Sequence, residues 1–267
     1  MNAVAVVTGA SSGIGRAFAQ SLAARGHDLV LVARREDRLR ELARLVGERH
    51  GVAARIVVAD LATDAGLAAC REAVTAAPQA PEVVVLNAGF GSRGRFWELD
   101  RERQSAMVRL NCLAVADLAA HVLPGMVARG SGALVVISSA AAWQPVPFMA
   151  TYAATKAFEL HLVEALAEEL RGTGVRALAV CPGPTRTEFS TGSEAGPAQW
   201  WIPFDDVDLV VRASWRALAA GRRRAATGPV ARGSMLAARI LPRGLVLRAA
   251  ALTHTTRRSL KGFDRAT

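Results

Sequence analysis

The sequence uses three residue types very sparingly. Its 267 residues include one tyrosine, two lysines in a total of 33 basic residues, and three cysteines. Cys70, Cys112 and Cys181 are too few, and odd in number, for a disulfide framework, and none has the CxxC spacing of a metal or redox site. We therefore expect a reducing compartment and no bound metal.

Signals for export and for membrane insertion are also lacking. No basic stretch followed by an apolar core opens the chain, and a motif with the look of a functional site begins by Thr8. No apolar run approaches the roughly 20 residues that a membrane-spanning helix needs. We therefore expect a cytoplasmic protein.

Acidic residues are nearly absent from the end of the chain. From Arg212 to Thr267 there are 13 lysines and arginines and a single acid, Asp264, so the net charge of +10 belongs to this part. Such a region attracts nucleic acid or an anionic membrane, or is simply an arginine-rich face in water. Because zinc-finger spacings and basic motifs interleaved with aromatic residues are lacking, we expect no nucleic-acid partner.

The sequence does contain a regular alternation of elements. Short apolar runs typical of strands occupy residues 3–8, 28–33, 54–59, 82–87, 133–138 and 175–181, each followed by a stretch long enough for a helix. Strands that are apolar on both faces, alternating with amphipathic segments, are typical of a parallel sheet covered by helices on both sides. We predict a single-domain, doubly wound α/β fold (the Rossmann fold) over residues 1–228, with about seven parallel strands, the seventh within 222–229. Residues 229–267 form a basic, amphipathic extension.

The first predicted strand runs into the glycine-rich segment TGASSGIG, residues 8–15. At such a junction one glycine permits the tight turn, a second lets the backbone approach a ligand, and a third lets the helix pack on the strand. The free N–H groups at the start of the helix attract a pyrophosphate. The segment therefore predicts a dinucleotide-binding loop.

The end of the second predicted strand bears on which dinucleotide binds. An acid there accepts hydrogen bonds from a ribose 2′-hydroxyl, whereas arginines accommodate a 2′-phosphate. Here Arg34 and Arg35 end the strand, while Glu36 and Asp37 fall in the first turn of the next helix, where negative charge is favourable in any case. We therefore expect NADP(H) in preference to NAD(H).

The only tyrosine and one of the two lysines, Tyr152 and Lys156, begin a segment with helical periodicity. At a spacing of four residues both side chains lie on one face of the helix, and a nearby ammonium lowers the pKa of a phenol. The pair is a candidate proton donor. Ser139, at the end of the fifth strand, is placed to bind a carbonyl, and Asn111 is a polar residue in an apolar context.

Together these features resemble the short-chain dehydrogenase/reductase family. The resemblance rests on TGASSGIG (8–15), NAG (87–89), Asn111, Ser139, YAATK (152–156) and PG (182–183), in the family's order and spacing, and it covers residues 1 to about 228. The TGxxxGxG spacing and the chain length favour the shorter reductase branch. The resemblance implies an NADP(H)-dependent oxidoreductase that interconverts a carbonyl and an alcohol, working as a homodimer or homotetramer built on residues 105–128 and 152–171.

The same resemblance implies a role for each matched residue. Tyr152 is the acid and base, Lys156 lowers its pKa and holds the nicotinamide ribose, Ser139 orients the carbonyl, and Asn111 supports a water that relays protons. The residues implied in cofactor binding are Gly9, Ser11, Ser12, Gly13, Ile14, Gly15, Asp60, Leu61, Asn87, Ala88, Gly89, Tyr152, Lys156, Pro182, Gly183, Thr185 and Thr187, besides Arg34 and Arg35.

The substrate region is expected after the sixth strand. Residues 184–204 form the predicted lid and are rich in aromatic side chains, and residues 143–149, WQPVPFM, supply the opposite wall. Such walls suit a lipophilic ketone or aldehyde, although the rings equally explain packing of the lid on the body.

Residues 230–260 of the extension interleave Leu, Ile and Val with Arg. They suit peripheral contact with an anionic membrane, closure of the substrate pocket, or a subunit interface. The alternative to an enzyme is a regulatory or scaffold protein that binds NADP(H) without chemistry.

Overall fold

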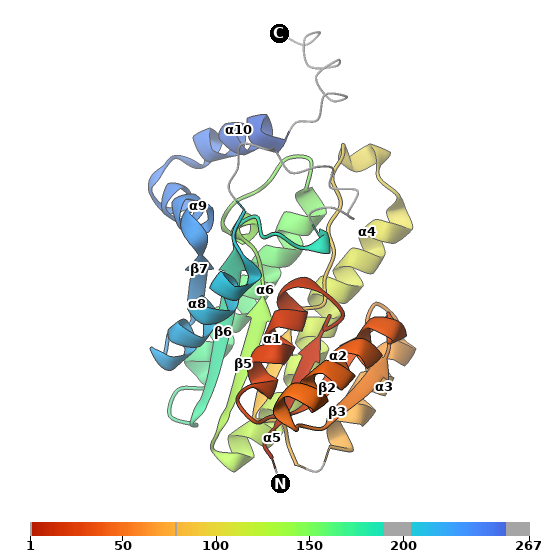
Figure 1. Cartoon of the computed structure of the whole chain (residues 1–267). Coiled ribbons are helices and arrows are strands. Elements are labelled where there is room, and N and C mark those ends of the chain that lie inside the picture. The colour runs from red at the N-terminus through yellow and green to blue at the C-terminus, as the bar shows by residue number, and fades with distance from the viewer. Residues whose placement is uncertain (1, 78, 190–203, 255–267) are drawn as a thin grey trace.

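A computed structural model describes residues 2–77, 79–189 and 204–254 of the chain (Figure 1). Its centre is a seven-stranded parallel sheet of order β3-β2-β1-β4-β5-β6-β7. The strands are β1 (Val4–Thr8), β2 (Asp28–Ala33), β3 (Ala54–Val58), β4 (Val83–Leu86), β5 (Gly132–Ile137), β6 (Val175–Pro182) and β7 (Arg224–Thr227). The predicted fold class is confirmed, including the short seventh strand.

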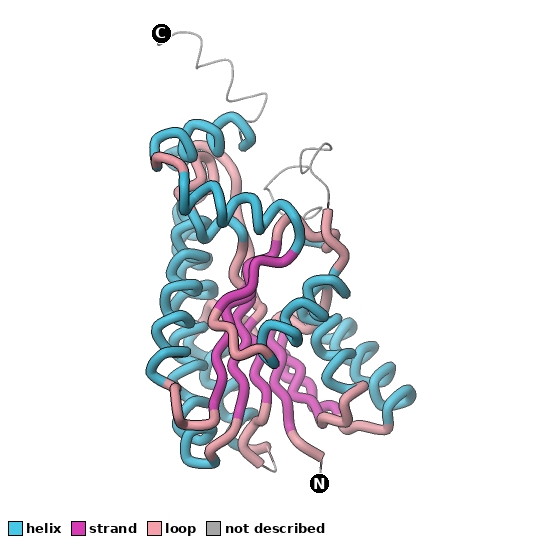
Figure 2. The backbone as a smooth tube through the Cα atoms, turned by 90° about the vertical axis from the view of Figure 1, so that its left-hand side faces the viewer, coloured by secondary structure: helices cyan, strands magenta, loops and turns pink. Residues whose placement is uncertain are grey.

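Helices cover both faces of the sheet, as Figure 2 shows. One layer holds α1 (Gly13–Ala23), α2 (Glu36–His50) and α8 (Val207–Ala219); the other holds α3 (Asp64–Thr75), α5 (Ala114–Arg129) and α6 (Ala150–Glu169). The remaining elements are η1 (Phe96–Glu98), α4 (Arg101–Val108), η2 (Arg109–Leu113), η3 (Ala140–Trp143), α9 (Gly228–Ile240) and α10 (Arg243–His254). Each layer buries its own apolar core against the strands.

The strand residues alternate between these two cores. Val4 and Val6 of β1 pack in the core beneath α3, α5 and α6, whereas Ala5 and Val7 pack in the core beneath α1, α2 and α8. All of β1 is buried as a result. A strand with water on neither face has no use for polar residues, which is why the strands read as continuous apolar runs.

The chain reverses its direction across the sheet between β1 and β4. β2 and β3 lie on one side of β1, and β4 to β7 lie on the other. The carboxyl ends of β1 and β4 therefore separate two sets of loops, and ligands of such sheets bind in the crevice between them. Hydrogen bonds cross this point, since the Thr8 hydroxyl accepts from the backbone N–H groups of Asn87 (2.9 Å) and Ala88 (3.1 Å).

A long continuous helix runs through α4, η2 and α5, from Arg101 to Arg129. By its length and by a mean hydropathy of 1.5 over its most apolar stretch, this helix could span a membrane. The search of the sequence for long apolar runs did not find it. The buried residues of α5, among them Val115, Leu118, Val122 and Met126, pack against the sheet within the core. The apolar character of this helix is thus explained by its place in the fold.

The two helices after β7 lie beyond the carboxyl ends of the strands (Figure 1). Ala231 of α9 and Val246 and Ala250 of α10 are buried. The first part of the predicted extension therefore packs on the α/β body, and of the predicted lid only residues 184–189 and 204 fall within the described residues.

Exposed apolar side chains occur on the helices expected to form a subunit interface. Val108, Leu113 and Phe158 are each exposed by two fifths or more. The homodimer or homotetramer expected from the sequence stays a prediction.

Candidate active site

A cavity of about 900 Å³ opens at the carboxyl ends of the strands. The sequence-predicted residues that line it are Gly9, Ser11, Ser12, Gly13, Ile14, Arg34, Arg35, Asp60, Leu61, Asn87, Ala88, Gly89, Ser139, Tyr152, Lys156, Pro182, Gly183, Thr185 and Thr187. Only Gly15 and Asn111 lie behind its surface. One cavity thus joins the predicted cofactor and catalytic groups.

The glycine-rich loop leaves no room for side chains. Gly9 and Gly13 have φ angles of +64° and +54°, which favour glycine. A Cβ on Gly15 would lie 2.4 Å from the carbonyl oxygen of Gly9 and 2.5 Å from Nδ2 of Asn87. Gly15 is therefore a packing residue, and the loop and the start of α1 present backbone N–H groups suited to a pyrophosphate.

Asn87 holds this loop in place. Its Nδ2 donates hydrogen bonds to the carbonyl oxygens of Thr8 (3.1 Å) and Gly9 (3.2 Å). With the Thr8 hydroxyl bonded in return to the backbone of Asn87, the ends of β1 and β4 are cross-linked. The side chain of Asn87 thus acts on a dinucleotide through the shape of the loop.

Of the two arginines after β2, Arg35 contacts the same loop and Arg34 does not. Nε and Nη2 of Arg35 donate to the Ser11 hydroxyl at 3.3 and 3.0 Å, and Nη1 forms an ion pair with Glu188 at 2.7 Å. Arg34 is largely exposed and lies 3.7 Å from Asp60. Hydrogen bonding and charge from Arg35 lower the pKa of Glu188, an acid near the cofactor side that the sequence did not single out.

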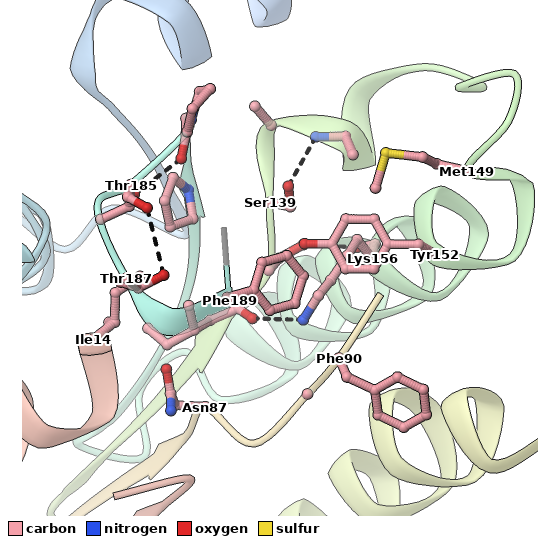
Figure 3. Close-up of a pocket in the computed structure, with 18 of the residues that line it drawn as sticks. Ile14, Asn87, Phe90, Ser139, Met149, Tyr152, Lys156, Thr185, Thr187 and Phe189 are labelled. Atoms are coloured by element: carbon pink, nitrogen blue, oxygen red, sulfur yellow. Dashed lines mark hydrogen bonds between the residues drawn. The ribbon is translucent and has the colours of Figure 1, made fainter. Parts of the chain in front are cut away.

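Tyr152 and Lys156 face the cavity from the first turns of α6 (Figure 3). Both are buried, and Lys156 Nζ lies 5.9 Å from the centre of the tyrosine ring. The ammonium donates to the carbonyl oxygen of Ile137 at 3.0 Å and to the carboxylate of Glu159 at 2.8 and 3.0 Å. The spacing of four residues places the pair as predicted.

The pKa of Tyr152 moves opposite to the expectation from the sequence. Burial raises it, and this outweighs the lowering by the charge of Lys156 and by the hydroxyl of Ser139. The tyrosine is therefore a phenol at neutral pH, a state that donates a proton. Lys156 limits the rise without reversing it, because desolvation of a phenolate is the larger effect here.

Glu159 is a site residue that sequence reasoning missed. It is fully buried one helical turn after Lys156, and burial raises its pKa to about 7 although Lys156 opposes the shift. Its negative charge in turn raises the pKa of Tyr152, of Lys156 and of the thiols Cys112 and Cys181. An acid three residues after the lysine, on the buried face of the helix, was the available signal.

Ser139 and Asn111 frame the tyrosine from two other elements. The Ser139 hydroxyl accepts a hydrogen bond from the backbone N–H of Ala141 at 3.1 Å, at the start of η3. The Ser139 side chain lies near the hydroxyl end of Tyr152 in Figure 3. Asn111 lies in the π-helical stretch η2, completely buried, and its Nδ2 donates to the carbonyl oxygen of Phe90 (3.1 Å) and to the Thr155 hydroxyl (3.0 Å). Asn111 therefore joins the loop after β4 to α6, and its water relay stays a prediction.

The segment after β6 closes the site from the opposite side. The Thr185 hydroxyl donates to the carbonyl oxygen of Gly183 and that of Thr187 to the carbonyl oxygen of Thr185. The Phe189 ring lies 5.7 Å from the ring of Tyr152, tilted by 40° (Figure 3). Trp200 and Trp201, two of the aromatic residues of the predicted lid, fall outside the described residues.

The family of the chain follows from comparison with known proteins. Residues 3–197 match the family model for the short chain dehydrogenases. The chain is also 32% identical over 210 residues to an uncharacterized oxidoreductase of Staphylococcus epidermidis, an alignment that covers 79% of this chain and 90% of that protein. The chain belongs to the short-chain dehydrogenase family, and it is therefore an oxidoreductase by family.

Solved structures of the family superpose well on this fold. A short-chain dehydrogenase from Sphingobium yanoikuyae in complex with NADPH is 36% identical, with a TM-score of 0.79 over 84% of this chain and 87% of that one. The bulky-bulky ketone specific alcohol dehydrogenase from Comamonas testosteroni is 32% identical, with a TM-score of 0.75 over 84% and 85%. A Burkholderia phymatum family member in complex with NAD is 25% identical, with a TM-score of 0.77 over 88% and 92%.

Replacing Glu159 by glutamine should change how stability depends on pH. The folded-state pKa of Glu159 is raised from 4.5 to about 7. Burial therefore favours the protonated acid, and its contribution to stability is complete below pH 4.5 and is lost as the pH rises through 7. We expect the free energy of unfolding of the wild type, relative to Glu159→Gln, to fall by up to a few kcal/mol across this window, measured by urea unfolding. The control Glu169→Gln, exposed at the C-terminal end of α6, should run parallel to the wild type. Parallel curves for all three proteins would contradict the burial of an ionisable Glu159.

Proposed function

We propose that the protein is an NADP(H)-dependent reductase that interconverts a lipophilic ketone or aldehyde and its alcohol. The observation that carries the proposal is the grouping of Ser139, Tyr152 and Lys156 in one cavity with the glycine-rich loop of β1. The sequence contains every residue of the catalytic set that the family resemblance implies: Asn111 in η2, Ser139 just before η3, and Tyr152 and Lys156 in α6. A bound nicotinamide supplies or accepts the hydride.

The side chains of this chain supply the proton and the orientation. Tyr152, a protonated phenol, donates a proton to the carbonyl oxygen as the hydride reaches the carbon. The Ser139 hydroxyl donates a hydrogen bond to the same oxygen and stabilises the charge that develops there. Lys156 stabilises the phenolate that remains until solvent returns a proton to it, and the reverse reaction uses the phenolate as the base.

The preference for NADP(H) rests on Arg34 and Arg35. Both line the cavity beside the glycine-rich loop, and Arg35 is already oriented by Ser11. Two guanidinium groups suit a 2′-phosphate. The carboxylate of Glu188, which pairs with Arg35, is unfavourable beside a phosphate because both are negative. Binding of a 2′-phosphate requires Arg35 to exchange its Glu188 partner, in whole or in part, for the phosphate.

A lipophilic substrate fits the other end of the cavity. Phe90, Val146 and Met149 come from the body, and Leu241 and Leu245 come from the segment of α9 and α10. Such walls stabilise an apolar body by removing it from water. The alcohol dehydrogenase from Comamonas testosteroni, named for bulky ketones, supports a ketone of similar breadth here.

The alternative is a non-catalytic NADP(H)-binding protein. Such a protein needs the glycine-rich loop but has no use for the proton donor, the ammonium beside it and the serine facing it. All three line the cavity in this chain, which favours the enzyme. The cytoplasmic location expected from the sequence stays a prediction.

The Tyr152→Phe variant tests the chemistry directly. It removes the proton donor and retains the ring that packs against Phe189, so we expect kcat for ketone reduction to fall by about 100-fold or more. The Kd for NADPH, measured by quenching of protein fluorescence, should stay close to that of the wild type. Wild-type turnover by this variant would rule out the assignment, and the absence of turnover in both proteins over a broad ketone panel would favour the non-catalytic alternative.

Replacing Arg34 and Arg35 by glutamine tests the cofactor preference. We expect the ratio of kcat/KM for NADPH to that for NADH to fall by about tenfold for each arginine lost, because each charge-assisted hydrogen bond to the phosphate disappears. Arg40→Gln, an exposed arginine on α2, is the matched control and should leave the ratio as it is. A wild type that prefers NADH would contradict the proposal outright.

We further propose that α9 and α10 contact an anionic membrane surface. The outer face of this pair exposes Leu236 (55%), Ile240 (67%) and Leu252 (80%). The two helices carry four arginines and no acid. Apolar side chains flanked by arginines suit insertion at the headgroup level of anionic lipid, beside the cavity that would receive a lipophilic substrate.

Vesicle sedimentation tests this contact. The wild type should sediment with phosphatidylserine-containing vesicles and remain in the supernatant with pure phosphatidylcholine vesicles. The double variant Leu236→Ser with Ile240→Ser should sediment less, because these side chains face water in the free protein and should lose only lipid contact. Equal recovery of the wild type in the supernatant with and without anionic vesicles would contradict membrane binding.

A further inference from the structure

Arg93 lies in the cavity wall, on the loop after β4, and has no role in the chemistry described above. Its Nη2 contacts the sulfur of Met149 at 3.9 Å, and its Nε is buried with no hydrogen-bond partner among the described residues. Burial lowers the pKa of the guanidinium. Within the part of the chain that the structure describes, Arg93 is thus partly removed from water and contacts only a thioether in compensation.

The other charged groups of the cavity wall are paired. Arg34 lies beside Asp60, Arg35 beside Glu188, and Lys156 beside Glu159. Among the described residues, Arg93 is the cavity-lining cation for which the structure shows no carboxylate. Burying an unpaired charge costs free energy, so a ligand that brings a negative charge to Arg93 recovers part of that cost.

The loop that carries Arg93 lies against the catalytic tyrosine. A Cβ on Gly91, two residues earlier, would lie 3.0 Å from the ring of Tyr152. Gly94, the next residue, donates its backbone N–H to the carbonyl oxygen of Phe148 at 2.9 Å. Met149, which Arg93 contacts, precedes Tyr152 by three residues at the start of α6. Arg93 therefore contacts a residue that lies about one helical turn before the proton donor.

We propose that Arg93 binds a carboxylate of the substrate, so that the enzyme acts on oxo acids with an apolar body. This inference rests on the proposed function and names its substrate class. A guanidinium pairs with a carboxylate through two parallel hydrogen bonds, and the apolar residues around it, such as Phe90 and Val146, strengthen that pair by excluding water. A single unpaired cation matches the single charge of a carboxylate better than the nearly double charge of a phosphate monoester.

Steady-state kinetics on a matched pair of ketones tests the proposal. The probes are 4-oxo-4-phenylbutanoate and its methyl ester, which share the ketone and the ring and differ in charge. We expect the wild type to have the higher kcat/KM for the acid, and Arg93→Gln to lower the acid-to-ester ratio by about 10- to 100-fold. Arg93→Lys should give an intermediate ratio, because it keeps the charge and loses the fork. Arg101→Gln, an exposed arginine at the start of α4, is the matched control and should keep the wild-type ratio.

Equilibrium binding separates this inference from the proposed function. Calorimetry with 4-phenylbutanoate, which has the carboxylate but no ketone, requires no turnover; its Kd should rise at least tenfold in Arg93→Gln and little in Arg101→Gln. An unchanged acid-to-ester ratio together with an unchanged Kd in Arg93→Gln would overturn the carboxylate site, even if the ester is reduced in a Tyr152-dependent way. If Arg93→Gln weakens the binding of 4-phenylbutanoate but the wild type reduces no ketone, the result would contradict the proposed function and leave the carboxylate site standing.

Discussion

A buried ammonium imposes the strictest constraint on this structure. Lys156 is buried in the wall of the cavity, where an unpaired charge is very unfavourable. It persists because the end of β5 offers the carbonyl oxygen of Ile137 and the helix itself offers Glu159. The positions of β5, α6 and the tyrosine one turn earlier are therefore linked through one nitrogen atom.

The electrostatic balance of the site follows from that pair. Burial has the largest effect on the pKa of Tyr152 and raises it; Lys156 opposes this rise and Glu159 adds a smaller one, so the phenol stays protonated. The chain thus combines a family arrangement of tyrosine and lysine with an acid that adjusts it.

The fold and the cofactor crevice could be predicted from the sequence because their causes are local. Apolar runs such as residues 28–33 indicate strands with no exposed face, and the glycines of residues 8–15 are needed wherever a strand turns into a helix beneath a phosphate. Arg34 and Arg35 come directly after the end of the second strand, where the adenosine ribose of a dinucleotide is expected. In each case residues that are close in sequence are also close in space, so the sequence pattern predicts where these residues lie in the fold.

Glu159 and Arg93 could not be placed in the same way, since a charged residue on a helix or loop is usually solvated. Only the packing of α6 on the sheet shows that Glu159 is buried, and only the packing of the loop after β4 on the start of α6 shows that Arg93 is partly buried. The sign of the pKa shift of Tyr152 was missed for the same reason. Desolvation depends on atoms that are distant in sequence, whereas the lysine four residues away was visible at once.

The direct junction of β7 and α9 at Thr227 and Gly228 bears on how substrate specificity can change during evolution. A Cβ on Gly228 would lie 1.8 Å from the Asp205 carboxylate, so the junction is fixed tightly to the body. Beyond it, α9 and α10 supply part of the cavity wall, and they follow the last strand of the sheet in the chain. Mutations there can reshape the pocket while the nucleotide crevice is inherited intact, which makes the chain's last helices a natural source of new specificity.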